Sequence, residues 1–107
     1  MNLLFFRQGW LYILQATSTG QYNRGVKNVT ETMYTKIYAE RGEVVDQKVF
    51  GNTNNTNPID LDINEQGVFI LLEFGSGMSP TVLAGTVWNT TQVNSDYPLT
   101  LFCTESL

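Results

Sequence analysis

The chain has 107 residues, a formal net charge of −4, 42% hydrophobic residues and 15% charged residues. A chain of this length is expected to form one domain, and it is too apolar to be disordered. Charged residues are scarcer than the roughly 25% typical of soluble domains. The six Lys and Arg residues are scattered along the first half. This speaks against nucleic-acid binding, because displacing counterions from phosphates needs clustered cations.

Residue types that carry much of enzyme chemistry are scarce. The chain has no histidine and a single cysteine, Cys103. Histidine is the commonest general base, the usual partner of Ser and Cys nucleophiles and a common zinc ligand. A single cysteine excludes an intrachain disulfide, and its apolar neighbours predict a buried, inert thiol. We therefore expect a protein that is not an enzyme and needs no cofactor.

The N-terminal stretch is apolar over residues 3–6 and is followed by Arg7. No basic residue precedes it, so it does not have the pattern of a signal peptide. No segment approaches the roughly 20 apolar residues of a membrane-spanning helix. The expected location is a virion or a cytoplasmic assembly, without membrane contact.

The first strong strand signal covers residues 9–17. Its alternation places Trp10, Tyr12 and Leu14 on one face. Residues 1–8 before it are expected to be an N-terminal arm or an edge strand.

Residues 32–40 and 43–50 predict a β-hairpin, since a gap of two residues separates two segments rich in strand formers. The expected register pairs Glu40 with Glu43 and leaves apolar side chains on both faces. Two interpretations are open. Either this is an edge hairpin on which long Lys side chains cover apolar surface, or its second face meets another subunit.

Residues 59–63 and 68–74 predict the central strand pair. The first segment alternates apolar and acidic residues, which suits a strand with one buried face. The second is the most apolar run in the chain and is expected to be buried on both faces. The polar turn between them ends at Gly67, where we expect a positive φ.

The remaining segments predict strands over 81–88 and 98–104, with a polar loop over 89–97. The expected fold class is therefore all-β: a small antiparallel β-sandwich, immunoglobulin-like or jelly-roll-like, of seven to eight short strands. A barrel is the alternative. No repeat or domain boundary is apparent, so residues 1–107 are expected to form a single domain. These residues identify no family.

Oxygen-bearing residues around the central turn are candidates for a metal site. Asp60, Asp62, Asn64 and Glu65 resemble the start of a calcium loop, but the sixth and twelfth positions hold Glu65 and Leu71, which excludes an EF-hand. A looser Ca²⁺ site of the same four residues stays open. Asp60 and Asp62 also lie about 7 Å apart on one strand face. That spacing would suit an inverting glycosidase, although two acids on a solvated strand face are the commoner arrangement.

Two classes of function fit these observations. The favoured one is a non-enzymatic structural protein of a larger assembly, such as a virion capsid, decoration or tail protein. It would act through contacts with other subunits, in a homo-oligomer or a larger particle. The interface candidates are the apolar N-terminal residues and hairpin aromatics: Leu3, Leu4, Phe5, Phe6, Tyr34, Tyr38 and Phe50.

The alternative is a carbohydrate-binding or receptor-binding module that stacks sugar rings on aromatic side chains. Its candidates are Trp10, Tyr12, Trp88 and Tyr97. Solvent exposure discriminates between the two. Buried Trp10 and Trp88, together with an exposed Leu4, Phe5 or Tyr34, would favour assembly.

Overall fold

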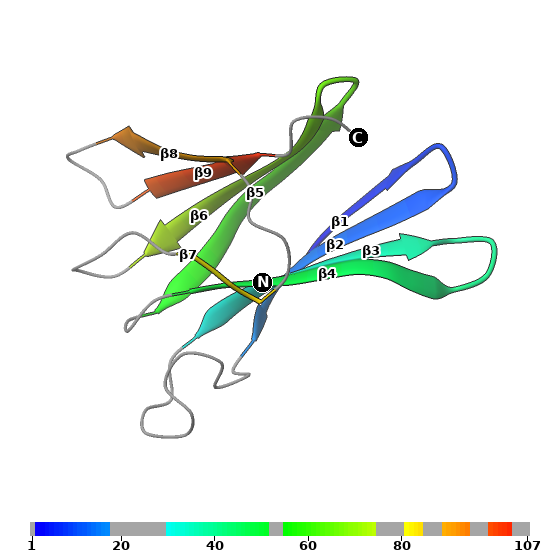
Figure 1. Cartoon of the computed structure of the whole chain (residues 1–107), viewed down its shortest axis with the longest axis horizontal. Coiled ribbons are helices and arrows are strands. Elements are labelled where there is room, and N and C mark those ends of the chain that lie inside the picture. Colours follow the sequence, from blue (N-terminus) through cyan, green and yellow to red (C-terminus); the bar gives the residue numbers. More distant parts are fainter. Residues whose placement is uncertain are drawn as a thin grey trace.

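The computed structural model describes residues 2–17, 30–51, 55–74, 81–84, 89–94 and 99–103. Within these ranges the chain forms β-strands and tight turns, and the strands make two antiparallel sheets stacked on one another (Figure 1). The predicted all-β sandwich is confirmed. The sheets do not close on each other, so the barrel alternative is wrong.

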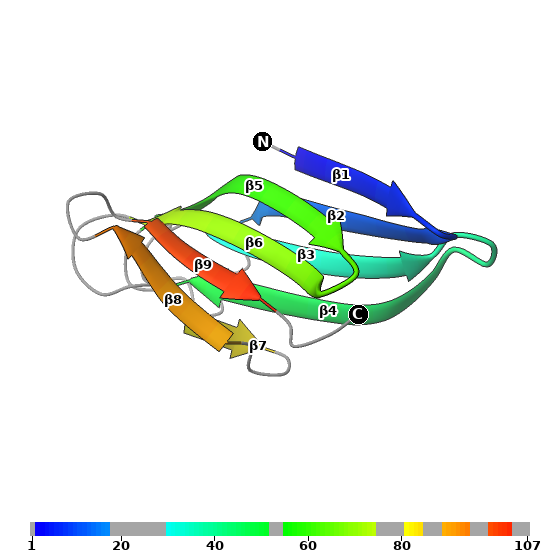
Figure 2. The same cartoon turned by 90° about the horizontal axis from the view of Figure 1, so that it is seen from above.

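The larger sheet has five strands in the order β1-β2-β3-β4-β7 (Figure 2). Their bounds are Asn2–Arg7, Trp10–Thr17, Glu31–Tyr38, Glu43–Gly51 and Thr81–Ala84. The first four strands follow one another as a meander, and β1 forms an edge. In the immunoglobulin order the third strand already belongs to the opposite sheet, so this arrangement differs from it.

The second sheet has four strands in the order β5-β6-β9-β8. Their bounds are Thr56–Asn64, Gly67–Phe74, Leu99–Cys103 and Asn89–Asn94. The prediction of a loop over 89–97 is wrong for residues 89–94, which pair with β9. The described residues therefore form nine strands rather than seven or eight. Pairing with a neighbouring strand, which a local pattern does not show, outweighs the low apolar content of β8.

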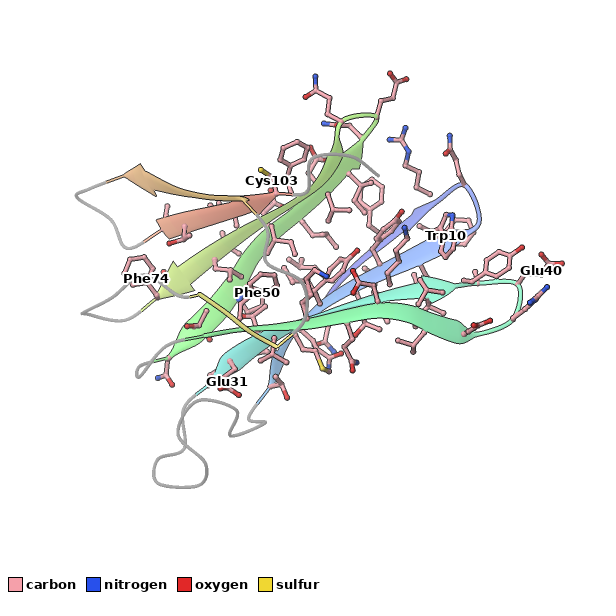
Figure 3. The ribbon with its side chains drawn as sticks, viewed as in Figure 1. Trp10, Glu31, Glu40, Phe50, Phe74 and Cys103 are labelled. Atoms are coloured by element: carbon pink, nitrogen blue, oxygen red, sulfur yellow. The ribbon has the colours of Figure 1, made fainter. Side chains whose placement is uncertain are left out.

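The core lies between the sheets and is built from alternate residues of the facing strands. Figure 3 shows Phe50 between the two layers. The buried cluster contains Tyr12, Leu14, Tyr34, Phe50, Leu61, Ile63, Val68, Ile70 and Leu72. Trp10, Tyr12 and Leu14 share one face of β2, as predicted, and this face packs against the core. On the opposite face of β6, Phe69 and Leu71 are half-buried and Glu73 is exposed, so the prediction that β6 is buried on both faces is wrong.

The hairpin of β3 and β4 has a longer turn than the sequence predicts. β3 ends at Tyr38, which pairs with Glu43, and residues 39–42 make the turn. The amide of Gly42, at φ 65°, donates to the Tyr38 carbonyl over 2.9 Å. The expected register is therefore wrong, because a four-residue turn satisfies these backbone groups where a two-residue turn was assumed. In the turn between β5 and β6, Gly67 has the expected positive φ, at 145°.

A bulge in β5 changes which residues face solvent. Leu61 and Ile63 are buried, whereas Asp60 and Asp62 are exposed, as their alternation predicts. The register with β6 shifts between residues 58 and 60, and Ile59 is left 40% exposed. A bulge adds one unpaired residue to a strand and reverses the alternation at that point.

The two sheets do not cover each other completely. Figures 1 and 2 both show the hairpin ends of β1–β2 and β3–β4 extending beyond the turn that joins β5 to β6. The larger sheet therefore presents two faces. We call the face turned away from the second sheet the outer face, and the face toward it the inner face.

Candidate functional site

The outer face carries the most exposed large apolar side chains of the described residues. In β1, Leu3 and Phe5 pack against the core. Because successive residues of a strand point to opposite faces, Leu4 and Phe6 point outward. They are 67% and 64% exposed. The N-terminal strand thus closes one edge of the core and displays two large apolar side chains to solvent.

Strand pairing extends this apolar surface across four strands. Phe6 pairs with Leu11, Leu11 with Ile37, and Ile37 with Val44. Directly paired residues of neighbouring antiparallel strands share a face. We call these four residues the apolar row; three strand spacings make it about 14 Å wide. Val44 at its far end is 54% exposed.

A second row lies beside the apolar row on the outer face. Leu4 pairs with Ile13, Ile13 with Thr35, and Thr35 with Gln47. The Gln47 amide donates to the Thr35 hydroxyl over 3.2 Å. Both rows consist of uncharged residues.

Several charged residues of these strands lie on the inner face instead, whereas Glu31, at the far end of β3, alternates with the outer face and is 1% exposed. Lys36 and Asp46 pair with each other in one inner row, and Lys48 pairs with Tyr34 in the next. Lys48 is 1% exposed. Its Nζ lies 2.8 and 3.0 Å from the two carboxylate oxygens of Asp46. Lys36, Asp46 and Lys48 therefore lie toward the second sheet, while the apolar row and the row beside it carry no charge.

Aromatic rings and cations alternate on the inner face near the hairpin ends. Trp10 and Tyr38 have ring centroids 5.1 Å apart. Lys36 Nζ lies 4.5 Å from the Trp10 ring centroid and 5.5 Å from that of Tyr12. Arg41 lies over the Tyr38 ring at 5.8 Å. Each contact of this kind stabilises by about 0.5–1 kcal/mol at exposed sites, so this cluster holds the projecting hairpins together.

Comparisons with known proteins give no further guide. No protein-family model, curated protein or solved structure matches this chain. Its function is therefore inferred from its own surfaces.

The structure divides the predicted interface residues into three groups. Leu4 and Phe6 are exposed on the outer face. Leu3, Phe5 and Tyr38 are half-buried on the inner face. Tyr34 and Phe50 are 1% and 0% exposed. Including these last two was wrong, because they are core residues and offer no surface to a partner.

Sequence reasoning missed four residues of the outer face: Leu11, Ile13, Ile37 and Val44. The signal was present, because Leu11 and Ile13 occupy the positions of β2 that alternate with the core residues Tyr12 and Leu14. Joining them to β1 and β4 requires the strand order, which the local pattern does not contain.

The described sugar-stacking candidates are already engaged within the chain. Tyr12 is 2% exposed and belongs to the core. Trp10 is half-buried and has Lys36 over its ring. Trp88 and Tyr97 lie outside the described residues. Leu4 is exposed, as the assembly criterion requires, whereas Tyr34 is buried. Trp10 is half-buried rather than fully buried, and Trp88 cannot be tested.

The acidic residues of β5 do not converge on a common point. Asp60 and Asp62 each accept a hydrogen bond of 2.9 Å from the next backbone amide. Asn64 accepts one of 2.7 Å from the amide of Gln66. Among the described residues, no group of three or more His, Cys, Asp or Glu side chains could hold a metal ion. Nothing in this geometry supports a calcium site that includes Glu65, or a pair of catalytic acids.

An open pocket of about 420 Å³ lies where β1 ends beside the β5–β6 turn. Its described lining is polar: Arg7, Asn64, Glu65 and Gln66. Arg7 Nη1 donates to the carbonyl of Ile63 over 3.2 Å. Small-molecule sites are mostly apolar with a few placed polar groups, so this pocket does not resemble one.

Two further predictions concern single features. Cys103 is a free thiol and is half-buried rather than fully buried. In the part of the chain that the structure describes, no helix is long and apolar enough to cross a membrane.

Burial makes the inner face sensitive to high pH. Burial raises the pKa of the Tyr34 hydroxyl well above its ordinary value of 10, and the Asp46 carboxylate and Tyr12 raise it further. Burial also raises the pKa of Tyr12, against a smaller lowering by Arg7. Below pH 10 both the folded and the unfolded states keep these protons. Above it the unfolded state loses them first, which favours unfolding.

We therefore expect the free energy of unfolding to fall by up to about 1.4 kcal/mol per pH unit above about pH 10 through Tyr34, with a further decrease from Tyr12. Urea unfolding between about pH 9 and about pH 11 measures this slope. Tyr34→Phe should reduce the slope by the contribution of one tyrosine. An unchanged slope in that variant would show that Tyr34 ionises normally in the folded protein.

Proposed function

We propose that this chain is a non-enzymatic structural subunit of a larger protein assembly, and that its outer face is the contact surface. The observation that carries the proposal is the apolar row, which crosses four strands and ends in exposed residues on both sides. A large exposed apolar patch on a small domain is typical of a protein–protein contact.

The energetics of the exposed side chains support a covered outer face. Leu4, Phe6 and Val44 are each more than half exposed. Moving a Leu, Phe or Val side chain from water into a contact stabilises by about 1.5–3 kcal/mol when burial is complete. Together these three side chains contribute several kcal/mol per copy, which offsets part of the free-energy cost of association.

The kind of assembly that best fits this chain is a virion particle, in which it would serve as a capsid, decoration or tail protein. A short sandwich with 15% charged residues and no histidine suits a role in packing rather than in chemistry. The carbohydrate-binding alternative has less support, because of its two described candidates Tyr12 is buried and Trp10 has Lys36 over its ring.

Particle mass in solution tests this function. We expect light scattering to give a mass above the 12.1 kDa of one chain, rising with concentration. The concentration range should run from about 1 µM to about 1 mM, which covers weak and moderate association. A chain that stays monomeric throughout this range would overturn the proposal.

A further inference from the structure

We propose that the outer face packs against the outer face of a second copy of this chain, so that two five-stranded sheets stack face to face. This inference rests on the proposed function and names the partner. Its centre is the apolar row of Phe6, Leu11, Ile37 and Val44. Leu4 and Ile13 flank the row on the same face.

The distribution of charge favours a second copy as the partner. When two identical faces meet about a twofold axis, a charged group near the axis approaches its own copy. The apolar row and the row beside it are uncharged, while Lys36, Asp46 and Lys48 lie on the inner face. Glu31, at the far end of β3, shares the outer face but is 1% exposed. Two rows without charge have no electrostatic repulsion to overcome when they meet their own copies. A strongly charged partner, by contrast, would find no complementary group in these rows.

The size of the face lies near the lower end of the range for a specific pair. Four strands about 4.8 Å apart and six residues about 3.4 Å apart span roughly 400 Å² in projection. Side-chain relief makes the accessible area larger, toward the roughly 600–800 Å² per partner of a small specific interface. Interfaces at this end of the range are commonly weak or transient, so association is to be measured from micromolar to millimolar concentration.

The geometry of stacking also sets the copy number. Aligned sheets pack about 10 Å apart with their side chains interdigitating, as in the core of a sandwich. The contact uses the same face on both copies, so pairing through it stops at two. The pair is then the unit from which the larger assembly is built through other surfaces.

Charge substitutions along the apolar row test this pairing. Phe6→Lys, Ile37→Lys and Val44→Lys each place an ammonium group in the contact without an opposite charge. We expect each to raise the dissociation constant at least about 100-fold, measured by analytical ultracentrifugation. Phe6 and Val44 are 64% and 54% exposed in a single copy, so circular dichroism should show an intact fold in those variants.

Ile59→Lys is the matched control. Ile59 is also an exposed apolar residue, at 40%, but it lies on β5 of the second sheet. We expect its dissociation constant to stay within about twofold of wild type. Because each copy carries a net charge of −4, screening should leave association unchanged or strengthen it between about 0.05 and about 0.5 M salt.

The outcomes separate this inference from the proposed function. Loss of association in Phe6→Lys alone would indicate pairing through the free edge of β1, since Ile37 lies two strands away from that edge. That result, or association that resists all three variants, overturns face-to-face stacking and leaves an assembling protein. A wild-type chain that is monomeric at every concentration overturns the proposed function as well. Association that weakens strongly with salt also contradicts an uncharged contact.

Discussion

Phe50→Ala is expected to lower the free energy of unfolding by about 3–5 kcal/mol, the range for removing a fully buried Phe side chain. Phe50 is 0% exposed and lies in the core between the two sheets (Figure 3). Small domains are stable by only about 5–15 kcal/mol in total. This one change should therefore remove much of the stability, and the urea midpoint of unfolding should fall accordingly.

Phe6→Ala is the matched control for this prediction. The chemical change is the same, but Phe6 is 64% exposed on the outer face. At concentrations where the chain is monomeric, we expect a loss of less than about 1 kcal/mol. Equal losses in the two variants would mean that the faces of β1 and β4 are assigned incorrectly. The pair thus separates the core from the proposed contact surface.

Asp46→Ala is expected to lower the free energy of unfolding by about 2–3 kcal/mol. The substitution removes the carboxylate that lies 2.8 Å from Lys48 Nζ. The Lys48 side chain is 2% exposed and the Asp46 side chain is 38% exposed. Breaking a fully buried ion pair from one side costs about 3–5 kcal/mol. The partial exposure of Asp46 places the expected loss at or below the lower end of that range. Urea unfolding near neutral pH measures it.

A second substitution distinguishes charge burial from simple loss of packing. In Asp46→Ala/Lys48→Met the buried charge is gone and an unbranched side chain of similar length fills its place, so we expect most of the lost stability to return. Glu43→Ala removes an exposed carboxylate from the same strand and should change stability by less than about 0.5 kcal/mol. A double variant less stable than Asp46→Ala would show that the ammonium group itself stabilises the fold.

Local patterns predicted those parts of the fold in which one strand face is plainly apolar. The alternation of Leu61 and Ile63 with Asp60 and Asp62 matches their burial in β5. The same reasoning failed at Ile59, because a bulge shifts the alternation by one residue. It also failed for β8, whose polar side chains carry no strand signal although its backbone pairs with β9.

The candidate site could be predicted only in part. Leu4 and Phe6 were identified from the apolar N-terminal stretch, and the structure exposes both. Tyr34 and Phe50 were placed at an interface from an incorrect hairpin register, and they lie in the core. A turn longer by two residues changes which residues oppose each other, and no single-strand pattern reports the length of the turn.

The sequence by itself determined that this protein is an all-β sandwich, that Leu61 and Ile63 of the first central strand are buried while Asp60 and Asp62 are exposed, and that histidine chemistry is absent. These follow from residue types and from the period of two along a strand, which are local properties. The tertiary structure alone decided that Phe6, Leu11, Ile37 and Val44 form one continuous apolar row and that Lys36, Asp46 and Lys48 lie on the opposite face. Residues from four strands become neighbours only through strand order and register. Strand order and register depend on turn lengths, bulges and the packing of the second sheet, and the residue pattern of a single segment does not specify these.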